Sequence, residues 1–198
     1  VHVHHVCDGW SQCPQRDDEW LCDDHTCPGG CQCFGSTFLC AQPFHAGLFT
    51  HLRYLDGSGT NMTLANVSSN RYLVYLKLAS CLIVNIPQMT LPNLQHLDLT
   101  DNVIVEINMT VFLGLLNLKV LVLTRNPLET ITSEPTNQHH YVLRTIDLSF
   151  TKLKVFSSSK FSAFRTLQHL NLSHTALETI DQDGFRHTPA LVNLDVRA

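Results

Sequence analysis

The 198-residue chain has no long apolar run and no cluster of basic residues. No stretch approaches the roughly 18 consecutive apolar residues that form a transmembrane helix. Its formal net charge of -4 gives no electrostatic reason to expect nucleic acid or an anionic membrane surface as a partner. The first five residues do not read as a signal peptide. We therefore expect a soluble piece whose leader or anchor, if any, lies outside it, and whose partner, if charged, is basic.

Motifs of common enzymes are absent as well. The sequence contains no Ser-His-Asp arrangement, no HExxH and no phosphate-binding loop. The repeats described below predict an open solenoid face, which seldom forms the closed, dry pocket that catalysis requires. We expect a protein that binds rather than an enzyme.

Cysteines, in contrast, are concentrated near the start of the chain. Seven of the eight fall between Cys7 and Cys40, a density typical of a disulfide framework formed in an oxidising compartment. N-x-Ser/Thr sequons, compatible with passage through a glycosylating pathway, occur at Asn61, Asn66, Asn108 and Asn171. Together these features predict an extracellular location.

A repeat organises the chain from Leu52 onward. The pattern L-x-x-L-x-L-x-x-(N/C/T)-x-L starts at Leu52, Leu73, Leu94, Leu118, Leu143 and Leu167, and begins again at Leu191. The intervals of 21, 21, 24, 25, 24 and 24 residues fall within the range of leucine-rich repeats. This period predicts an α/β fold class, namely a right-handed leucine-rich-repeat solenoid with a parallel concave sheet and little helix.

Each repeat should contribute one short strand whose leucines point inward while the third, fifth and seventh positions point outward. Side chains at the ninth position should be buried and bond the backbone of the turn: Thr60, Cys81, Asn102, Asn126, Thr151 and Thr175. Cys81 lies in register with this set, so we interpret it as a structural thiol rather than a nucleophile or ligand. A second apolar set should pack on the convex side: Ile107, Phe112, Ile131, Phe156, Phe161, Phe164, Ile180 and Phe185.

The spacing CxxxCxCxxxxxxC over residues 27–40 resembles the cysteine-rich N-terminal cap of extracellular leucine-rich-repeat proteins. The resemblance implies the disulfides Cys27–Cys33 and Cys31–Cys40. It also implies a cap that covers the apolar end of the first repeat. A zinc site is the competing interpretation of four close cysteines.

Residues 1–22 resemble the C-terminal half of a low-density-lipoprotein-receptor class A module, on the run from Cys7-Asp8-Gly9-Trp10 to Asp18-Glu19-Trp20-Leu21-Cys22. The resemblance implies a Cys7–Cys22 disulfide and a calcium ion as cofactor. The implied calcium ligands are the side chains of Asp8, Gln12, Asp18 and Glu19 and the backbone carbonyls of His5 and Trp10. Gln12 replaces an acidic ligand, which predicts weaker calcium binding, and an acidic disulfide loop without metal is the alternative. Cys13 would pair with a residue before Val1, so we expect a fragment of a larger protein.

The predicted order is thus a half-module at 1–22, a cap at 27–40 and about seven repeats, the last incomplete, at 41–198. This order resembles the ectodomain of relaxin-receptor-type G-protein-coupled receptors, particularly the molluscan type with an array of class A modules. The resemblance implies a cell-surface receptor whose concave face binds a peptide or protein ligand. The alternative is an adhesion or innate-recognition protein, on the membrane or secreted, without a seven-helix domain.

Outward positions of the predicted strands supply candidate contacts for such a ligand. The fifth position is acidic in four repeats and could meet a basic ligand, and the third position adds aromatic surface. These candidates are Asp56, Asp98, Asp147, Asp195, Tyr54, Tyr75 and His96. Asn171 also points onto this face, where a glycan would obstruct ligand binding.

Overall fold

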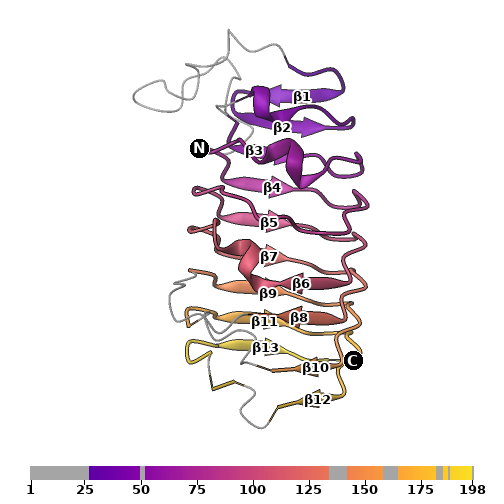
Figure 1. Cartoon of the computed structure of the whole chain (residues 1–198), viewed down its shortest axis with the longest axis vertical. Coiled ribbons are helices and arrows are strands. Elements are labelled where there is room, and N and C mark those ends of the chain that lie inside the picture. Colours follow the sequence, from indigo (N-terminus) through magenta and orange to yellow (C-terminus); the bar gives the residue numbers. More distant parts are fainter. Residues whose placement is uncertain are drawn as a thin grey trace.

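The computed structural model describes residues 27–49, 52–133, 142–157, 165–181, 185–186 and 188–197. Strands stack one above another along the long axis of the molecule and form a nine-stranded sheet (Figure 1). The sheet begins with an antiparallel hairpin, β1 (Cys31–Phe34) and β2 (Thr37–Cys40), and continues with parallel strands. The parallel strands are β3 (Tyr54–Asp56), β4 (Tyr75–Lys77), β5 (His96–Asp98), β7 (Val120–Val122), β9 (Thr145–Asp147), β11 (His169–Asn171) and β13 (Asn193–Asp195).

Each parallel strand begins two residues after a predicted repeat start, so the leucine spacing predicted the correct register.

Behind this sheet lie two short parallel pairs. They are β6 (Glu106–Asn108) with β8 (Thr130–Thr132) and β10 (Val155–Phe156) with β12 (Thr179–Ile180). Helix in the described residues is limited to the 3-10 turns η2 (Ala46–Leu48), η3 (Leu64–Val67) and η4 (Met109–Phe112). The predicted solenoid with little helix is confirmed. No helix in these residues is both long and apolar enough to cross a bilayer.

The core lies between the sheet and the convex layer. Inward leucines such as Leu94, Leu97 and Leu99 are fully buried, because neighbouring repeats cover both sides of each one. On the convex side Phe156 is buried and stacks on Phe185, with ring centroids 5.3 Å apart.

One predicted member of the convex layer does not pack as expected. Ile180 is 42% exposed, and among the described strands its strand β12 pairs with β10 alone. Phe161 and Phe164 lie outside the described residues.

Ninth-position side chains bond the turns as predicted. Thr151 Oγ1 donates to the Leu148 carbonyl at 2.8 Å, and Asn126 Nδ2 donates to the Leu123 carbonyl at 2.9 Å. Cys81 is a buried free thiol whose Sγ lies 3.2 Å from the Gly57 carbonyl oxygen. These contacts support the structural interpretation of this cysteine.

The disulfides Cys27–Cys33 and Cys31–Cys40 close the N-terminal hairpin, in the pairing that the cap resemblance implies. All four thiols are consumed in these bonds, so the zinc interpretation is wrong. Beneath the hairpin, Phe38 is fully buried and its ring centroid lies 5.1 Å from that of Phe49. The hairpin and its aromatic rings therefore cover the apolar end of the first repeat.

Candidate functional site on the concave face

Third-position side chains of the first three repeats form a stack on the exposed face of the sheet. Strand pairing places Tyr54, Tyr75 and His96 side by side. The two tyrosine rings lie 4.2 Å apart with an interplanar angle of 5°, and the Tyr75 and His96 rings lie 4.3 Å apart at 11°. We call these three residues the aromatic stack. Their faces contact one another, so they present edges, hydroxyls and ring nitrogens to a ligand.

Burial favours the neutral forms of two members of the aromatic stack, Tyr75 and His96. Partial burial is the main cause that raises the pKa of Tyr75. The neighbouring Tyr54 raises this pKa as well, and so do the carboxylates of Asp98 and Asp56. Burial also lowers the pKa of His96, although Asp98 acts in the opposite direction. These shifts favour an uncharged imidazole at His96 and a protonated phenol at Tyr75.

Fifth-position side chains form a second column beside the stack. In strand order this column is Asp56, Lys77, Asp98, Val122, Asp147, Asn171 and Asp195. Acidic residues dominate it, as predicted, but Lys77 separates the first two aspartates.

The aspartates of this column also close their own turns. Asp98 Oδ1 accepts hydrogen bonds from the Thr100 backbone N–H at 2.9 Å and from the Thr100 hydroxyl at 2.6 Å. Asp56 accepts the same pair of bonds from Ser58, and Asp147 Oδ1 accepts from a backbone N–H two residues later. Each is an Asx turn that ends the strand. The sequence pattern alone suggested ligand contacts, whereas the structure shows that one carboxylate oxygen of each already has a structural partner.

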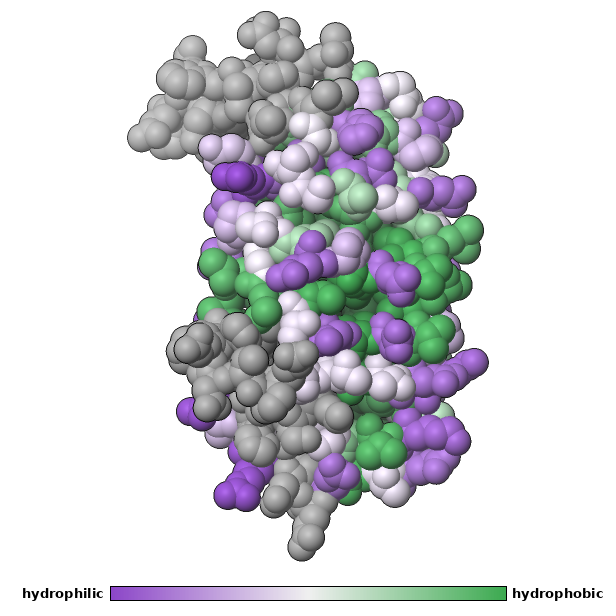
Figure 2. All heavy atoms as spheres, in the orientation of Figure 1, coloured by the Kyte–Doolittle hydropathy of each residue, from purple (hydrophilic) through white to green (hydrophobic). Residues whose placement is uncertain are grey.

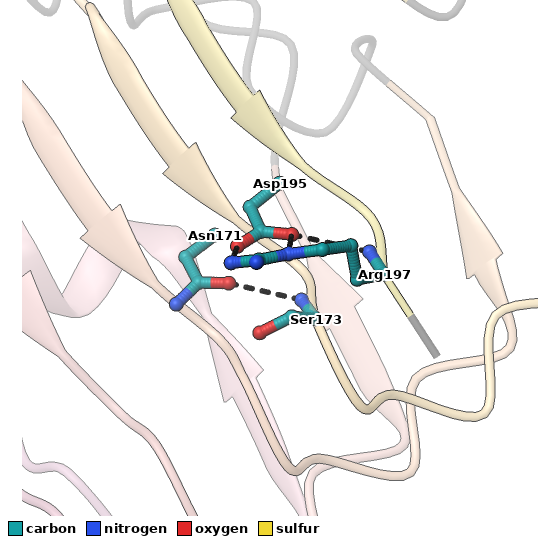
Figure 3. A network of polar contacts seen from close by, with 4 residues as sticks. All are labelled: Asn171, Ser173, Asp195 and Arg197. Carbon is teal, nitrogen blue, oxygen red and sulfur yellow. Dashed lines mark hydrogen bonds and ion pairs between the residues drawn. The ribbon is translucent and has the colours of Figure 1, made fainter.

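The last two repeats differ from the others at the fifth position (Figure 3). Asn171 Oδ1 accepts a hydrogen bond from the Ser173 backbone N–H at 3.0 Å, so an amide closes this turn as well as a carboxylate does. Asp195 instead receives the backbone N–H of Arg197 and two guanidinium N–H groups, with Nε at 2.9 Å. These hydrogen bonds lower the pKa of Asp195 to about 2.

Ligand contact by Asp195 stays a prediction, and the structure adds that this carboxylate already has a partner in its own chain. Its carboxylate is neutralised by a cation of the same chain, Arg197. The sequence held one signal for this pair. The seventh position carries serine or threonine beside each of the other capping residues, at Ser58, Thr100, Ser149 and Ser173, but arginine at 197.

A shallow hollow of about 390 Å³ lies over the last three strands of the sheet. It is lined by fifth-position residues including Asp147 and Asn171, and by His169 and Asn193, whose Nδ1 and Nδ2 atoms are 2.8 Å apart. The concave face thus carries stacked aromatic rings and charged side chains over β3 to β5, and polar and charged side chains around a hollow over β9 to β13.

The four sequons differ in their surroundings. Asn61 and Asn108 are exposed and lie outside the concave positions. Asn66 is half-buried, and its Oδ1 accepts a hydrogen bond from the Thr63 backbone N–H at 2.9 Å. Asn171 lies on the concave face, as predicted.

The implied calcium ligands and the Cys7–Cys22 pair fall in residues 1–22, which lie outside the described residues. Within the part of the chain that the structure describes, no group of three or more His, Cys, Asp or Glu side chains could hold a metal ion.

A family model described as "Leucine rich repeat" matches residues 92–134 and 142–198, just over half of the chain. Mouse Toll-like receptor 9 is 28% identical over 179 residues, which is 81% of this chain and 17% of the receptor. Chicken Tsukushi is 39% identical over 75 residues, 37% of this chain and 20% of Tsukushi. Mouse transforming growth factor beta activator LRRC32 is 33% identical over 84 residues, 41% of this chain and 12% of that protein. The chain therefore spans a fifth or less of these relatives.

Among solved structures, a TLR13–ssRNA13 complex matches with a TM-score of 0.67 and 30% identity, over 76% of this chain and 23% of that one. An internalin C2 from Listeria monocytogenes matches with a TM-score of 0.60 and 21% identity, over 76% of this chain and 64% of that one. The second likeness shows the fold alone.

Proposed function

This chain belongs to the leucine-rich-repeat family, and from that premise we propose that it is an extracellular ligand-recognition region whose concave face binds a peptide or protein. The observation that carries the proposal is the continuous exposed face on which the aromatic stack and the fifth-position column run side by side. Aromatic edges next to charged groups are typical of protein interfaces. The disulfide-bonded cap supports an oxidising, extracellular setting.

Charge supports a basic ligand group. Asp98 and Asp147 each use one carboxylate oxygen in a turn, which leaves the other oxygen available to a guanidinium or ammonium. The same carboxylates would repel the phosphates of a nucleic acid. Although one structural neighbour is a complex with single-stranded RNA, these charges favour a peptide or protein for this chain.

Two molecular contexts remain for this region. The seven-helix, relaxin-receptor context depends on the order of motifs that begins in residues 1–22. Relatives that are a Toll-like receptor and a growth-factor activator support the other context, a leucine-rich-repeat receptor or adhesion protein without seven helices. We propose the second. The sequence of the full-length transcript decides between them. If it encodes seven apolar helices downstream of these repeats, the relaxin-receptor context is established.

The basic-ligand proposal is tested with a synthetic octa-arginine peptide as probe and an octa-aspartate peptide as its counterpart. We expect the arginine peptide to bind, and Asp98→Asn with Asp147→Asn to weaken binding by about tenfold or more, because two charge-assisted contacts lose their charge. Asparagine preserves both turns, as Asn171 shows. Glu106→Gln with Glu129→Gln removes the same charge from exposed positions outside the concave column and serves as the matched control. Equal weakening in both double variants, or no binding of the arginine peptide, would reject a concave basic-ligand site.

Calcium binding by Asp8, Gln12, Asp18 and Glu19 is a separate part of the proposal. Hard oxygen donors of this kind suit calcium, and the amide of Gln12 should make binding weaker than in a fully acidic set. Isothermal titration of the chain with calcium chloride tests it. Heat that disappears with Asp18→Asn supports the site, and no heat from the unaltered chain removes calcium from the proposal.

We also propose that glycans occupy the exposed Asn61 and Asn108 and leave Asn171 free. Asn66 is intermediate, since it is half-buried. A glycan at Asn171 would cover the hollow over β9 to β13. Mass spectrometry of glycopeptides from secreted protein measures the occupancy, and a glycan at Asn171 would contradict ligand binding at that repeat.

A further inference from the structure

The convex side of the solenoid is interrupted between β8 and β10. Its described strands form two separate pairs, β6 with β8 and β10 with β12, whereas the concave strands of the same repeats belong to one continuous sheet. Figure 1 shows β8 and β10 farther apart than the two strands within either pair. The two pairs therefore face each other with unpaired edges, and an unpaired edge is where a further strand can add.

Backbone hydrogen bonds assign the interruption to a single step of the convex ladder. In the first pair the Glu129 N–H donates to the Val105 carbonyl, and in the second pair the Glu178 N–H donates to the Lys154 carbonyl, both at 2.8 Å. The equivalent bond between the pairs, from the Lys154 N–H to the Glu129 carbonyl, is not formed, and neither group has another partner among the described residues. One edge thus offers an acceptor and the other a donor, which are the groups that one parallel strand between them would bond.

A cavity of about 560 Å³ opens at this interruption. Its size is within the range of ligand pockets. Both edges line it, with residues 129–131 on the β8 side and residues 152–155 on the β10 side. Ile131 and Leu153, which are 7% and 4% exposed, give the cavity an apolar floor, while Val155 is 52% exposed. Alternating buried and exposed side chains of this kind are what a strand in the gap would pack against.

The charge of this flank changes along the solenoid. The tenth position is apolar in earlier repeats, at Leu82 and Val103, and carries Lys152 beside the cavity. Figure 2 shows hydrophobic side chains at the right-hand edge near the middle of the molecule and hydrophilic ones below them. Lys154 forms an ion pair with Glu178 at 3.1 Å, whereas Lys152 forms none in the part of the chain that the structure describes. Lys152 is therefore a cation that an acidic ligand group would complement.

We propose that an extended peptide segment of a partner protein inserts between β8 and β10 as a parallel strand and joins the two convex pairs into one sheet. Its backbone donates to the Glu129 carbonyl and accepts from the Lys154 N–H, which is strand addition at two edges. Leu128 and Ile131 of the neighbouring repeat turn inward, so apolar residues at the matching positions of the segment reach the floor of the cavity. The residue before the first of them lies opposite Lys152 and is acidic. This site is on the convex side and does not depend on the concave ligand.

A synthetic peptide, ELTTIT with blocked ends, is the probe. Its leucine and isoleucine have the spacing of Leu128 and Ile131, and its glutamate is placed for Lys152. We expect the peptide to bind and to protect the Lys154 amide against hydrogen exchange, followed by nuclear magnetic resonance. The same peptide with an N-methyl group on its third residue keeps every side chain but cannot donate to the Glu129 carbonyl. It should bind about tenfold more weakly.

Three variants of the chain test the side chains. Lys152→Glu should weaken binding of ELTTIT by about tenfold and reverse the preference in favour of KLTTIT, because the charge opposite the first residue changes sign. Arg71→Glu makes the same change at an exposed position remote from the cavity and should leave ELTTIT binding unchanged. Ala176→Trp places a large side chain in the cavity from an exposed position and should abolish ELTTIT binding. Circular dichroism establishes that each variant is folded.

Three results would overturn the inference. The first is no binding of ELTTIT to the unaltered chain at millimolar concentration. The second is equal binding of the N-methylated peptide, which would mean that the cavity holds apolar side chains without strand pairing. The third is equal loss of ELTTIT binding in Lys152→Glu and Arg71→Glu. Octa-arginine binding by Ala176→Trp is measured in parallel and should be unchanged, so that failure of the convex site and failure of the concave site are distinguished.

Discussion

The middle repeats and the repeats that flank them hold their turns with different side chains. In the middle, Asn102 Oδ1 accepts from the backbone N–H groups of Cys81 and Ile83, both at 3.0 Å. Its Nδ2 donates to the carbonyls of Leu78 and Leu99, both at 2.9 Å. Three of these four partners belong to the preceding repeat, so the asparagine joins two repeats.

Threonine at the same position acts only within its own repeat. Thr60, Thr151 and Thr175 each donate one hydroxyl hydrogen bond to the carbonyl three residues earlier. In a solenoid, stability is a sum of repeat terms and nearest-neighbour terms. This chain therefore couples its repeats most strongly around Asn102 and Asn126, while the threonines stabilise single turns.

Removing an asparagine should therefore have the largest effect. Asn102→Ala leaves two buried backbone N–H groups and two carbonyls without this partner, and we expect the free energy of unfolding to fall by about 3 kcal/mol or more. Urea unfolding followed by circular dichroism measures it. Asn117 is the matched control, because its Nδ2 makes one exposed bond to the Pro92 carbonyl at 2.7 Å. Asn117→Ala should cost less than about 1 kcal/mol, and equal losses in both variants would refute the coupling role of Asn102.

The corresponding change in a flanking repeat should be smaller. Thr151→Ala removes one buried hydrogen bond and a methyl group, and we expect a loss of about 1.5 kcal/mol in the same urea experiment. Thr151→Ser retains the hydroxyl and should recover most of the loss. A loss as large as that of Asn102→Ala would mean that threonine and asparagine at this position stabilise the solenoid equally.

Position five allows the turn-closing role to be separated from charge. Asp98→Ala removes the acceptor for both Thr100 groups and should lower the free energy of unfolding by about 1 kcal/mol. Asp98→Asn keeps that acceptor and should stay within about 0.5 kcal/mol of the unaltered chain. If Asp98→Asn proved as damaging as Asp98→Ala, the charge rather than the turn would stabilise this strand end.

The leucine spacing predicted the strands well because those leucines are buried between repeats, where only one register buries them all. Ninth-position residues such as Asn102 and Cys81 were predictable for the same reason. The third-position stack also follows from register, since Tyr54, Tyr75 and His96 share one column.

What the sequence could not predict depends on variable positions that the repeat motif leaves open. The Asp195–Arg197 pair arises from one unusual residue at position seven. The exposed, left-handed Leu82 depends on how the turn between β4 and β5 is closed, and the motif does not specify that closure. The Asx turns were missed as a competing role of the aspartates, because a carboxylate that closes a turn and one that awaits a ligand look alike in sequence.

The smallest expected effect is an increase in the free energy of unfolding. Asn126 Nδ2 donates to the carbonyls of Leu99 and Leu123, although Leu99 also accepts a bond from Asn102. One carbonyl therefore serves two successive asparagines. Thr151→Asn would bring a new amide within reach of Leu123 in the same way, at nearly unchanged side-chain volume. We expect the free energy of unfolding to rise by about 0.5 kcal/mol, the low end of the net value of a hydrogen bond.

Thr145→Asn is the control for this gain. Position 145 lies on the concave face in β9, away from the turn of the preceding repeat that an asparagine at position 151 would bond. This substitution should bring no gain and should lower the stability by up to about 1 kcal/mol, because asparagine is less favourable than threonine in a strand. Thr151→Asn could instead destabilise the chain. In that case the stabilisation by the asparagines of the middle repeats would depend on the conformation of the turns around them, and an amide at this position would not be sufficient. Coupling between repeats would then be a property of the backbone at Asn102 and Asn126, and could not be transferred along the solenoid by substitution.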